Sequence, residues 1–430
     1  MDFSTIVGLL MFAAVILTVT FKVIPLTVSY GLIPIIAALV MGYSPVEIVD
    51  LVSGTMVSNM TGSAMLLFFS IPFFTILSEA GMFDVIVDKI LKLAKGNPLV
   101  IYYATILVAV VSMLDGSLIT TYAITIPALL PLYKKLGLDR RFLLLLCAWT
   151  TMFMFMPWGS VPVLMASTAG IDIFESVYHC LPAIFFGAAM TFAIATFQGL
   201  KDRKRLGNMS TDDLVAARAA EANPMNRPKL FWVDLLLFIL LLAILTFVRS
   251  IPAYIVFLVF TLVALTINYP NADDVKKIFN KAAPTFYNYV IIVMSISVLI
   301  GVFTKTPVMD GFVNLVITLI PGGLARYTHI IFALLAVPVF RFIPYQVYIS
   351  LFPFMVAVGA QYGVSAQSVM APFMVGLCFG TGCSPMVAQT YLGLSLCELD
   401  LDDYMKYAFW KCWIGSIIMV IFGVAVGLYF

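Results

Sequence analysis

An acid and a run of hydroxyl side chains interrupt one of the most apolar parts of the chain. Residues 111–137 read VSMLDGSLITTYAITIPALLPLYKKLG. The polar centre of this stretch consists of Asp115, Gly116, Ser117, Thr120 and Thr121. A charged side chain costs about 2.5–3.5 kcal/mol at the centre of a bilayer, and such residues usually mark a substrate or ion pathway. The stretch therefore predicts a polar site inside a membrane.

The composition supports the membrane assignment and excludes several classes of function. Of 430 residues, 62% are hydrophobic and 11% are charged, with a mean hydropathy of +1.07, whereas soluble domains carry about 25% charged residues. The net charge of +2 offers no nucleic-acid surface. The six cysteines show no CxxC spacing and are interpreted as buried small hydrophobes. Because HExxH and GxSxG motifs are absent, we expect no enzyme activity and no resident cofactor.

The two halves of the chain match without a gap when Asp84 is aligned with Asp310. Most of the matching residues are Gly or Pro, which end or interrupt helices. The matching pairs are Asp84/Asp310, Gly96/Gly322, Tyr122/Tyr348, Pro127/Pro353 and Gly137/Gly363. Under the same constant offset Asp115 corresponds to Arg341. Such internal similarity is typical of transporters built from inverted repeats.

We therefore predict an all-α polytopic membrane protein with a first repeat at 1–200, a cytoplasmic linker at 201–230 and a second repeat at 231–430. Each repeat is expected to have five membrane crossings, one re-entrant hairpin and one interrupted helix. The hairpins are expected at about 98–134 and 326–359, and the interrupted helices at about 141–170 and 366–396. Further spans are expected near 4–20, 24–42, 61–80, 178–199, 231–249, 252–268, 284–304 and 410–429, with amphipathic helices at 82–95 and 308–320.

The length of the segment 98–134 favours a re-entrant hairpin over two full membrane crossings. About 17 apolar residues lie on each side of its polar centre. Two full crossings would place Asp115 at the far water face, whereas a hairpin places it near the midplane. Non-helical backbone is tolerated there only inside protein or beside a water-filled cavity.

The distribution of Lys and Arg predicts the orientation. With the linker in the cytoplasm, 20 of the 24 basic residues lie on the cytoplasmic side, as the positive-inside rule requires. This arrangement predicts a multi-pass protein of the cell membrane with both termini outside.

The predicted interior chemistry suits an anion. Helices that begin at mid-membrane direct unpaired N–H groups and positive dipole ends into the cavity. Arg341 could grip a carboxylate with two hydrogen bonds, and Asp115 is a natural coupling site for H⁺ or a metal ion. Three alternatives stay open: Asp115 and Arg341 could pair structurally, the interruptions could be simple kinks, and the hydroxyl groups could bond to their own helices.

Several longer motifs resemble a known family. AGMFDVIVDKILKLAKGNPLVI, the 111–137 stretch, MPWGSVP and SPMVAQTYLGLSLCELDLDDYMKYAFWKCW are similar to the citrate–metal ion:proton symporters of bacteria, within the ion transporter superfamily. The resemblance covers about residues 45–420. It implies a homodimer in which a transport domain moves like an elevator against a scaffold.

By position, the resemblance places binding segments at Asp115–Thr121, Pro157–Ser160, Arg341–Gln346 and Gly380–Pro385. This chain differs from the family at three places. In the first hairpin tip the family has two acids spaced as D-G-D, and Ser117 replaces the second of them here. The second tip reads PYQV where the family has Asn-Asp, and the first interruption reads PWGSV where the family has PWGGP. Fewer acids mean fewer hard oxygen ligands for Mg²⁺ or Ca²⁺. This difference favours a free di- or tricarboxylate coupled to H⁺ or Na⁺ over a metal complex.

The sequence thus predicts a secondary active transporter for citrate or a related acid. The expected partners are a small organic anion, the lipid bilayer and a second copy of the chain. The predicted substrate-binding residues are Asp115, Gly116, Ser117, Thr120, Thr121, Trp158, Gly159, Ser160, Arg341, Gln346, Gly382 and Ser384. An Na⁺/H⁺ or other inorganic-ion exchanger of the same superfamily, or a channel, is the alternative.

Overall fold

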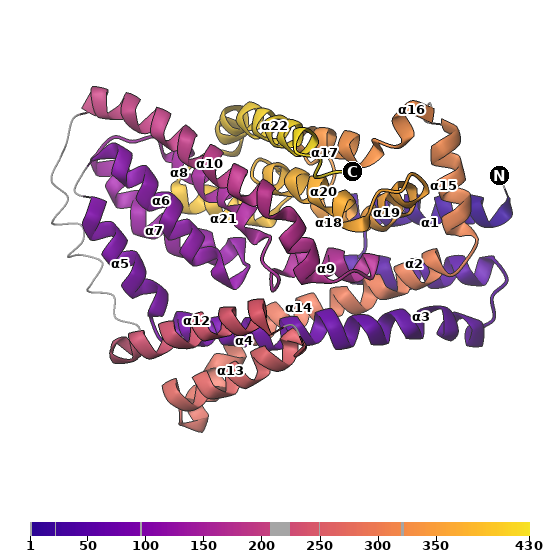
Figure 1. The fold of residues 1–430 in the computed structure, drawn as a ribbon, viewed down its shortest axis with the longest axis horizontal. Helices are drawn as coiled ribbons and strands as arrows, with labels where there is room; N and C mark the ends of the chain where they lie inside the picture. Colours follow the sequence, from indigo (N-terminus) through magenta and orange to yellow (C-terminus); the bar gives the residue numbers. More distant parts are fainter. Residues whose placement is uncertain (1, 22, 95–96, 207–223, 249, 320–321) are drawn as a thin grey trace.

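Every regular element in the described part of the chain is a helix (Figure 1). The computed structural model describes residues 2–21, 23–94, 97–206, 224–248, 250–319 and 322–430. The prediction of an all-α fold is therefore confirmed. Six described helices are long and apolar enough to cross a membrane.

The first half begins with the helices α1 (Phe3–Thr20), α2 (Leu26–Val40), α3 (Pro45–Asn59), the π-helix η1 (Met60–Ala64), α4 (Met65–Glu79) and α5 (Met82–Ala94). It continues with α6 (Pro98–Ser112), the 3₁₀ turn η2 (Met113–Asp115), α7 (Leu118–Lys135), α8 (Arg140–Trp149), η3 (Thr150–Met154), α9 (Ser160–Ala169) and α10 (Ile173–Leu206).

The second half begins with η4 (Pro228–Leu230), α12 (Phe231–Phe247), α13 (Ala253–Asn268), α14 (Ala272–Thr304), α15 (Val308–Leu319) and α16 (Gly322–Ala325). It ends with α17 (Thr328–Val339), α18 (Tyr345–Ser350), α19 (Phe352–Gln361), α20 (Ala366–Thr381), α21 (Ala388–Cys397) and α22 (Leu401–Ala425).

The order of elements in the second half repeats that of the first. Helices α5 and α15 begin at Met82 and Val308, and helices α8 and α20 begin at Arg140 and Ala366. Both pairs of starts have the same offset as Asp84 and Asp310. Helices α10 and α22, which begin at Ile173 and Leu401, come close to it. This correspondence supports the predicted repeat, while its inversion across a bilayer stays a prediction.

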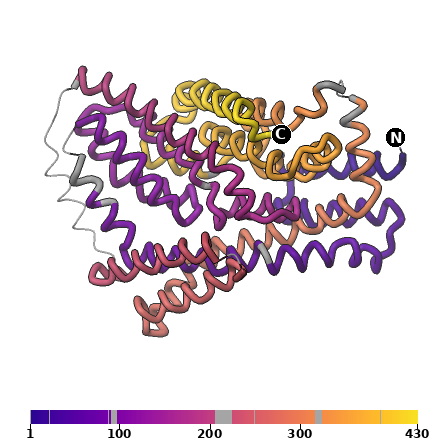
Figure 2. Tube along the Cα trace, viewed as in Figure 1, coloured from indigo at the N-terminus to yellow at the C-terminus, as the bar shows by residue number. Residues whose placement is uncertain are grey.

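The helices form two layers. The long-helix layer consists of α1–α4 and α12–α14, and the hairpin layer of α6–α10 and α17–α22, with α5 and α15 running between the layers at opposite ends of the molecule (Figure 1). In the hairpin layer, α6 and α7 pack side by side and turn at η2, and α17 turns back through α18 and α19. The tube in Figure 2 shows the first hairpin entering from the end that carries the linker and the second from the opposite end, with both tips near the middle of the molecule.

Two long helices begin earlier than the hydropathy pattern predicted. The predicted span 61–80 belongs to a helical rod that starts at Pro45, and the predicted span 284–304 belongs to α14, which starts at Ala272. Ser44 and Glu47 form a capping box before the first of these helices, and the side chain of Asn271 caps the second. These caps stabilise the polar first turns of the two helices. A prediction based on hydropathy detects only the apolar part of a helix and so misses such turns.

The predicted linker 201–230 also starts too early, because α10 continues to Leu206. Asp202 is only 3% exposed and accepts hydrogen bonds from the Tyr102 hydroxyl at 2.6 Å and from the Gln198 amide at 2.8 Å. Arg205 lies 3.1 Å from the same carboxylate. Satisfied polar contacts therefore extend the helix into a charged sequence, and residues 207–223 lie outside the described part of the chain.

At the same end of the molecule, the first hairpin is tied to the turn after α21. Glu398 lies 2.6 Å from Lys134 and 3.1 Å from Arg140. The hydrogen bond and charge of Lys134 lower the pKa of Glu398 below its usual value. The contribution of this contact to stability is therefore present above the unfolded pKa of the carboxyl, and it is lost as the pH falls through the folded one.

We predict that Asp202→Ala destabilises the fold by about 1–3 kcal/mol, because the buried Tyr102 hydroxyl and the half-buried Gln198 amide lose their acceptor. Asp202→Asn keeps an acceptor oxygen and is expected to cost less. Unfolding in mixed micelles measures the change, and Lys201→Ala, at an exposed neighbouring position, is the control. Equal stability of Asp202→Ala and the control would contradict the structural role of this carboxylate.

Candidate functional site

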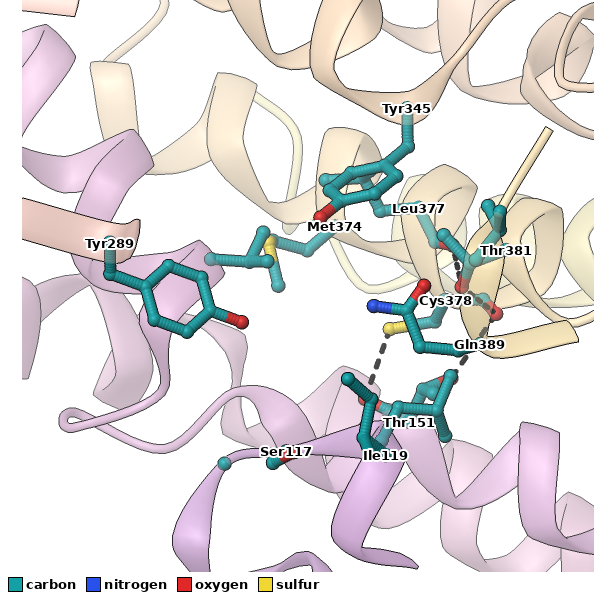
Figure 3. Close-up of a pocket in the computed structure, with 14 residues that line it drawn as sticks. Ser117, Ile119, Thr151, Tyr289, Tyr345, Met374, Leu377, Cys378, Thr381 and Gln389 are labelled. Carbon is teal, nitrogen blue, oxygen red and sulfur yellow. Dashed lines mark hydrogen bonds between the residues drawn. The ribbon is translucent and has the colours of Figure 1, made fainter. Parts of the chain in front are cut away.

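A cavity lies between the hairpin layer and the long-helix layer, where both helix interruptions meet the first hairpin tip (Figure 3). It holds about 590 Å³ of space, including its open mouth. Its wall includes the first hairpin tip at Gly116–Ile119, Val161 after the first interruption and Val387 at the second. Parts of the first hairpin tip and of both interrupted helices therefore lie together at this cavity.

Three of the longer described helices begin at this cavity, in addition to the six-residue α18, which starts at the lining residue Tyr345. Leu118 and Ile119 start α7, Val161 is the second residue of α9, and Gln389 is the second residue of α21. Gly159 and Val387 precede α9 and α21 without a side-chain cap. Because the first N–H groups of a helix have no intrahelical partner and carry the positive end of its dipole, three helix starts make the cavity favourable for an anion.

Neutral polar side chains complete the described lining. They are Ser117, Thr151, Tyr289, Tyr345, Thr381 and Gln389. Tyr289 comes from α14 in the long-helix layer and points into the cavity from the side opposite Thr381 and Gln389 (Figure 3). None of the described lining residues carries a charge, so the polar groups that the cavity offers are neutral side chains and helix N-termini.

The two interrupted helices are joined beside the cavity by reciprocal hydrogen bonds. The Thr151 hydroxyl donates to the carbonyl oxygen of Cys378 at 3.1 Å, and the Cys378 thiol donates to the carbonyl oxygen of Thr151 at 3.2 Å. Both residues line the cavity. This pair fixes the two halves of the chain relative to one another at the site.

Each hairpin tip is also held by the interruption of the helix that follows it. The indole N–H of Trp158 donates to the carbonyl oxygen of Leu114 at 2.8 Å, and the Ser384 hydroxyl donates to the carbonyl oxygen of Phe340 at 2.5 Å. Trp158 and Ser384 are equivalent positions in the two repeats, as are Leu114 and Phe340. The two halves therefore make the same contact with different side chains, and each of these residues, both predicted to bind substrate, holds a hairpin tip.

Asp115 lies beside the cavity and does not form part of its described lining. Its Oδ1 accepts the backbone N–H of Ser117 at 2.8 Å, and the Thr120 hydroxyl and the Tyr289 phenol lie near its carboxyl group. No basic side chain in the described part of the chain lies within ion-pair distance of it. The buried hydroxyl of Ser160 also lies near the Tyr289 phenol. A carboxyl group from the first tip and a hydroxyl group from the start of α9 thus lie close to the cavity.

Arg341 is separated from both Asp115 and the cavity. Its guanidinium group lies 5.0 Å from the centre of the Phe409 ring on α22. The ion pair with Asp115, one of the alternatives that the sequence left open, is absent among the described contacts, and Arg341 lies against α22. Arg341 is therefore not positioned here to grip a ligand in the cavity.

Of the remaining predicted residues, Gly116 and Ser117 belong to the described lining and the others do not. Gly116 adopts a positive φ of 75° and packs against Gly159, where an added Cβ would lie 3.2 Å from the neighbouring Cα. Thr121 bonds back to its own helix through the carbonyl oxygen of Ser117. Gly382 accepts the Tyr404 hydroxyl at its carbonyl oxygen. Gln346 lines a second hollow beside the α1–α2 turn.

Sequence reasoning missed Thr151, Tyr289 and Gln389, and it included Tyr345 only within the segment Arg341–Gln346. Gln389 follows the interruption GTGCSP and could have been found as the second residue of a new helix start. Tyr289 lies within a long apolar helix, and nothing in its sequence surroundings distinguishes it from a packing residue.

The sequence model of the family described as "Citrate transporter" matches residues 5–384. The chain is also similar to a Bacillus subtilis (strain 168) protein named "Citrate transporter", with 30% identity over 375 residues that cover 86% of this chain and 87% of the relative. A "Mg(2+)/citrate complex secondary transporter" of the same organism is 29% identical over 401 residues, which cover 91% of each chain.

Two solved structures share the fold. The YdaH transporter of Alcanivorax borkumensis has a TM-score of 0.54 and 15% identity, covering 87% of this chain and 88% of its own. Neisseria gonorrhoeae MtrF has a TM-score of 0.58 and 18% identity, covering 86% of this chain and 83% of its own. At these identities the likeness concerns the fold alone.

We predict that Trp158→Phe loosens the first hairpin tip and Ser384→Ala the second, each by about 1–3 kcal/mol, because a buried carbonyl loses its donor. Hydrogen exchange should therefore accelerate at the backbone amide of Gly116 in the first variant and of Arg341 in the second, by about tenfold per 1.4 kcal/mol. Trp410→Phe, at a residue 60% exposed, is the control. Equal acceleration at both tips in either variant would refute separate contacts.

Proposed function

Because the chain belongs to the citrate transporter family, we propose that it is a secondary active transporter of citrate or a related di- or tricarboxylate. Membership and the apolar helices make it a multi-pass membrane transporter and not an enzyme. The observation that carries the carboxylate proposal is the convergence of α7, α9 and α21 on one cavity by their N-termini.

The residues that line the cavity bear on whether the substrate is carried as a free acid or as a metal complex. The described lining contains no carboxylate or imidazole, and the described residues contain no cluster of three or more His, Cys, Asp or Glu that could hold a metal ion. If Mg²⁺ travels with the acid, as the name of one relative implies for that protein, the acid and water must supply its oxygen ligands. We propose the free tricarboxylate as the principal cargo.

We further propose that the hairpin layer moves as a transport domain against the long-helix layer, in a homodimer. Tyr289 supports the elevator motion, because it is the contribution of the long-helix layer to a cavity otherwise lined by the hairpin layer. A sliding motion would therefore carry the cargo away from this phenol. Mass photometry of the detergent-solubilised protein tests the dimer.

Asp115 is proposed as the coupling group for H⁺ or Na⁺. Its carboxylate has no basic partner in the described part of the chain and lies at the hairpin tip that lines the cavity. Binding of a cation or proton there would reduce the repulsion of an anionic cargo.

We predict that Gln389→Leu raises the Kd for citrate about three- to tenfold, because a cavity hydrogen-bond donor is lost. Arg341→Ala should change Kd less than about twofold on the same scale, because that side chain lies over Phe409. Calorimetric titration with citrate, with and without Mg²⁺, measures both variants. Gln361→Leu, at an exposed position, is the matched control, and a large loss in Arg341→Ala alone would restore the residue to the site.

Asp115→Asn is predicted to abolish accumulation of citrate in proteoliposomes while preserving citrate–citrate exchange. The amide cannot carry the negative charge or release a proton at neutral pH, but its oxygen can still accept the Ser117 N–H. Uptake under imposed pH and Na⁺ gradients is compared with counterflow in the same vesicles. Continued accumulation against a gradient would move the coupling site elsewhere.

A further inference from the structure

A lysine at the end of the molecule near the linker is held between two aromatic rings, without a carboxylate partner among the described residues. Lys89 Nζ on α5 lies 4.7 Å from the ring centre of Phe231 and 5.1 Å from that of Trp232, at the start of α12. Lys89 is exposed, as is Trp232, at 70%. The rings attract and orient the ammonium group but do not neutralise it.

The second half of the chain provides an internal control for this arrangement. Helix α15 repeats α5 at the opposite end of the molecule, yet residues 308–319 contain no Lys or Arg. The position equivalent to Lys89 is Leu315. The helix can therefore be built without a basic residue, so the charge on α5 is specific to one end of the molecule.

An apolar stripe continues from Trp232 along the outside of α12. Leu236, Ile239 and Leu240 are 55%, 52% and 44% exposed. Their spacing places them on the face of the helix that begins with Trp232. A cation and an indole at the head of such a stripe match the headgroup and acyl chain of one amphipathic molecule.

We propose that Lys89, Phe231 and Trp232 form a binding site for the phosphate of an anionic phospholipid, whose acyl chain follows α12. Exposed Lys229, just before the start of α12, adds positive charge at the same end. In the orientation predicted by the basic residues, this end faces the cytoplasmic leaflet, where anionic lipids attract Lys and Arg near the surface. The site is independent of the cargo site.

The position of α5 gives such binding a consequence for transport. Helix α5 follows α4 of the long-helix layer, precedes α6 of the first hairpin, and packs against α12. A lipid that binds both Lys89 and α12 would restrain α5, which connects the two layers. Anionic lipid is therefore expected to alter the transport rate through α5.

The test uses quenching of Trp232 fluorescence by brominated lipids in nanodiscs. The Trp232 signal is the difference between the parent protein and Trp232→Phe. We expect brominated phosphatidylglycerol to quench it more strongly than brominated phosphatidylcholine. Lys89→Gln should reduce this preference about fivefold, because each lysine near an anionic surface contributes about that factor in affinity.

Lys276→Gln, at an exposed position on α14, is the matched control and should retain the preference. Equal quenching by the two lipids, or equal preference in Lys89→Gln and Lys276→Gln, would overturn the proposal. Displacement of the lipid by inorganic phosphate would instead assign the site to a free anion and would also overturn it. A signal that follows protein concentration and not lipid would assign the face to a second copy of the chain, which is equally incompatible with the proposal.

Discussion

Two equivalent hydrogen bonds hold the centre of this structure together. Each hairpin tip offers a backbone carbonyl, and the interruption of the following helix supplies the donor: Trp158 to Leu114 and Ser384 to Phe340. Unpaired backbone carbonyls deep in a membrane protein are costly. Each interrupted helix thus supplies a hydrogen-bond donor for a backbone carbonyl that the neighbouring hairpin tip exposes.

These contacts explain why the cavity contains so few of the residues that the sequence marked as chemical. The Trp158 indole, the Ser384 hydroxyl and the glycine at 159 are used to close the tips, and the guanidinium group of Arg341 lies over a ring. The groups that remain available to a ligand are the helix N-termini and the uncharged hydrogen-bond donors of the cavity lining. In a low-dielectric interior such donors attract an anion without the cost of burying a fixed cation.

The sequence predicted the all-α class because that feature depends on local signals. Apolar length, Gly and Pro punctuation and the constant offset between the repeats can all be read along the sequence. It did not predict where α3 and α14 begin, because polar first turns depend on caps such as Ser44 and Asn271. Nor could it assign Tyr289 to the cavity or Arg341 to Phe409, because both placements are set by packing between helices that are distant in the sequence.

The Trp158 ring touches more than its hydrogen-bond partner. It is stacked with Phe74 at 5.8 Å and meets Phe257 at 6.1 Å between ring centres, and both of these rings belong to the long-helix layer. Any displacement between the layers must separate these rings while the bond to Leu114 travels with the hairpin. The fluorescence emission of the Trp158 indole depends on which rings surround it. This indole therefore reports movement between the hairpin layer and the long-helix layer.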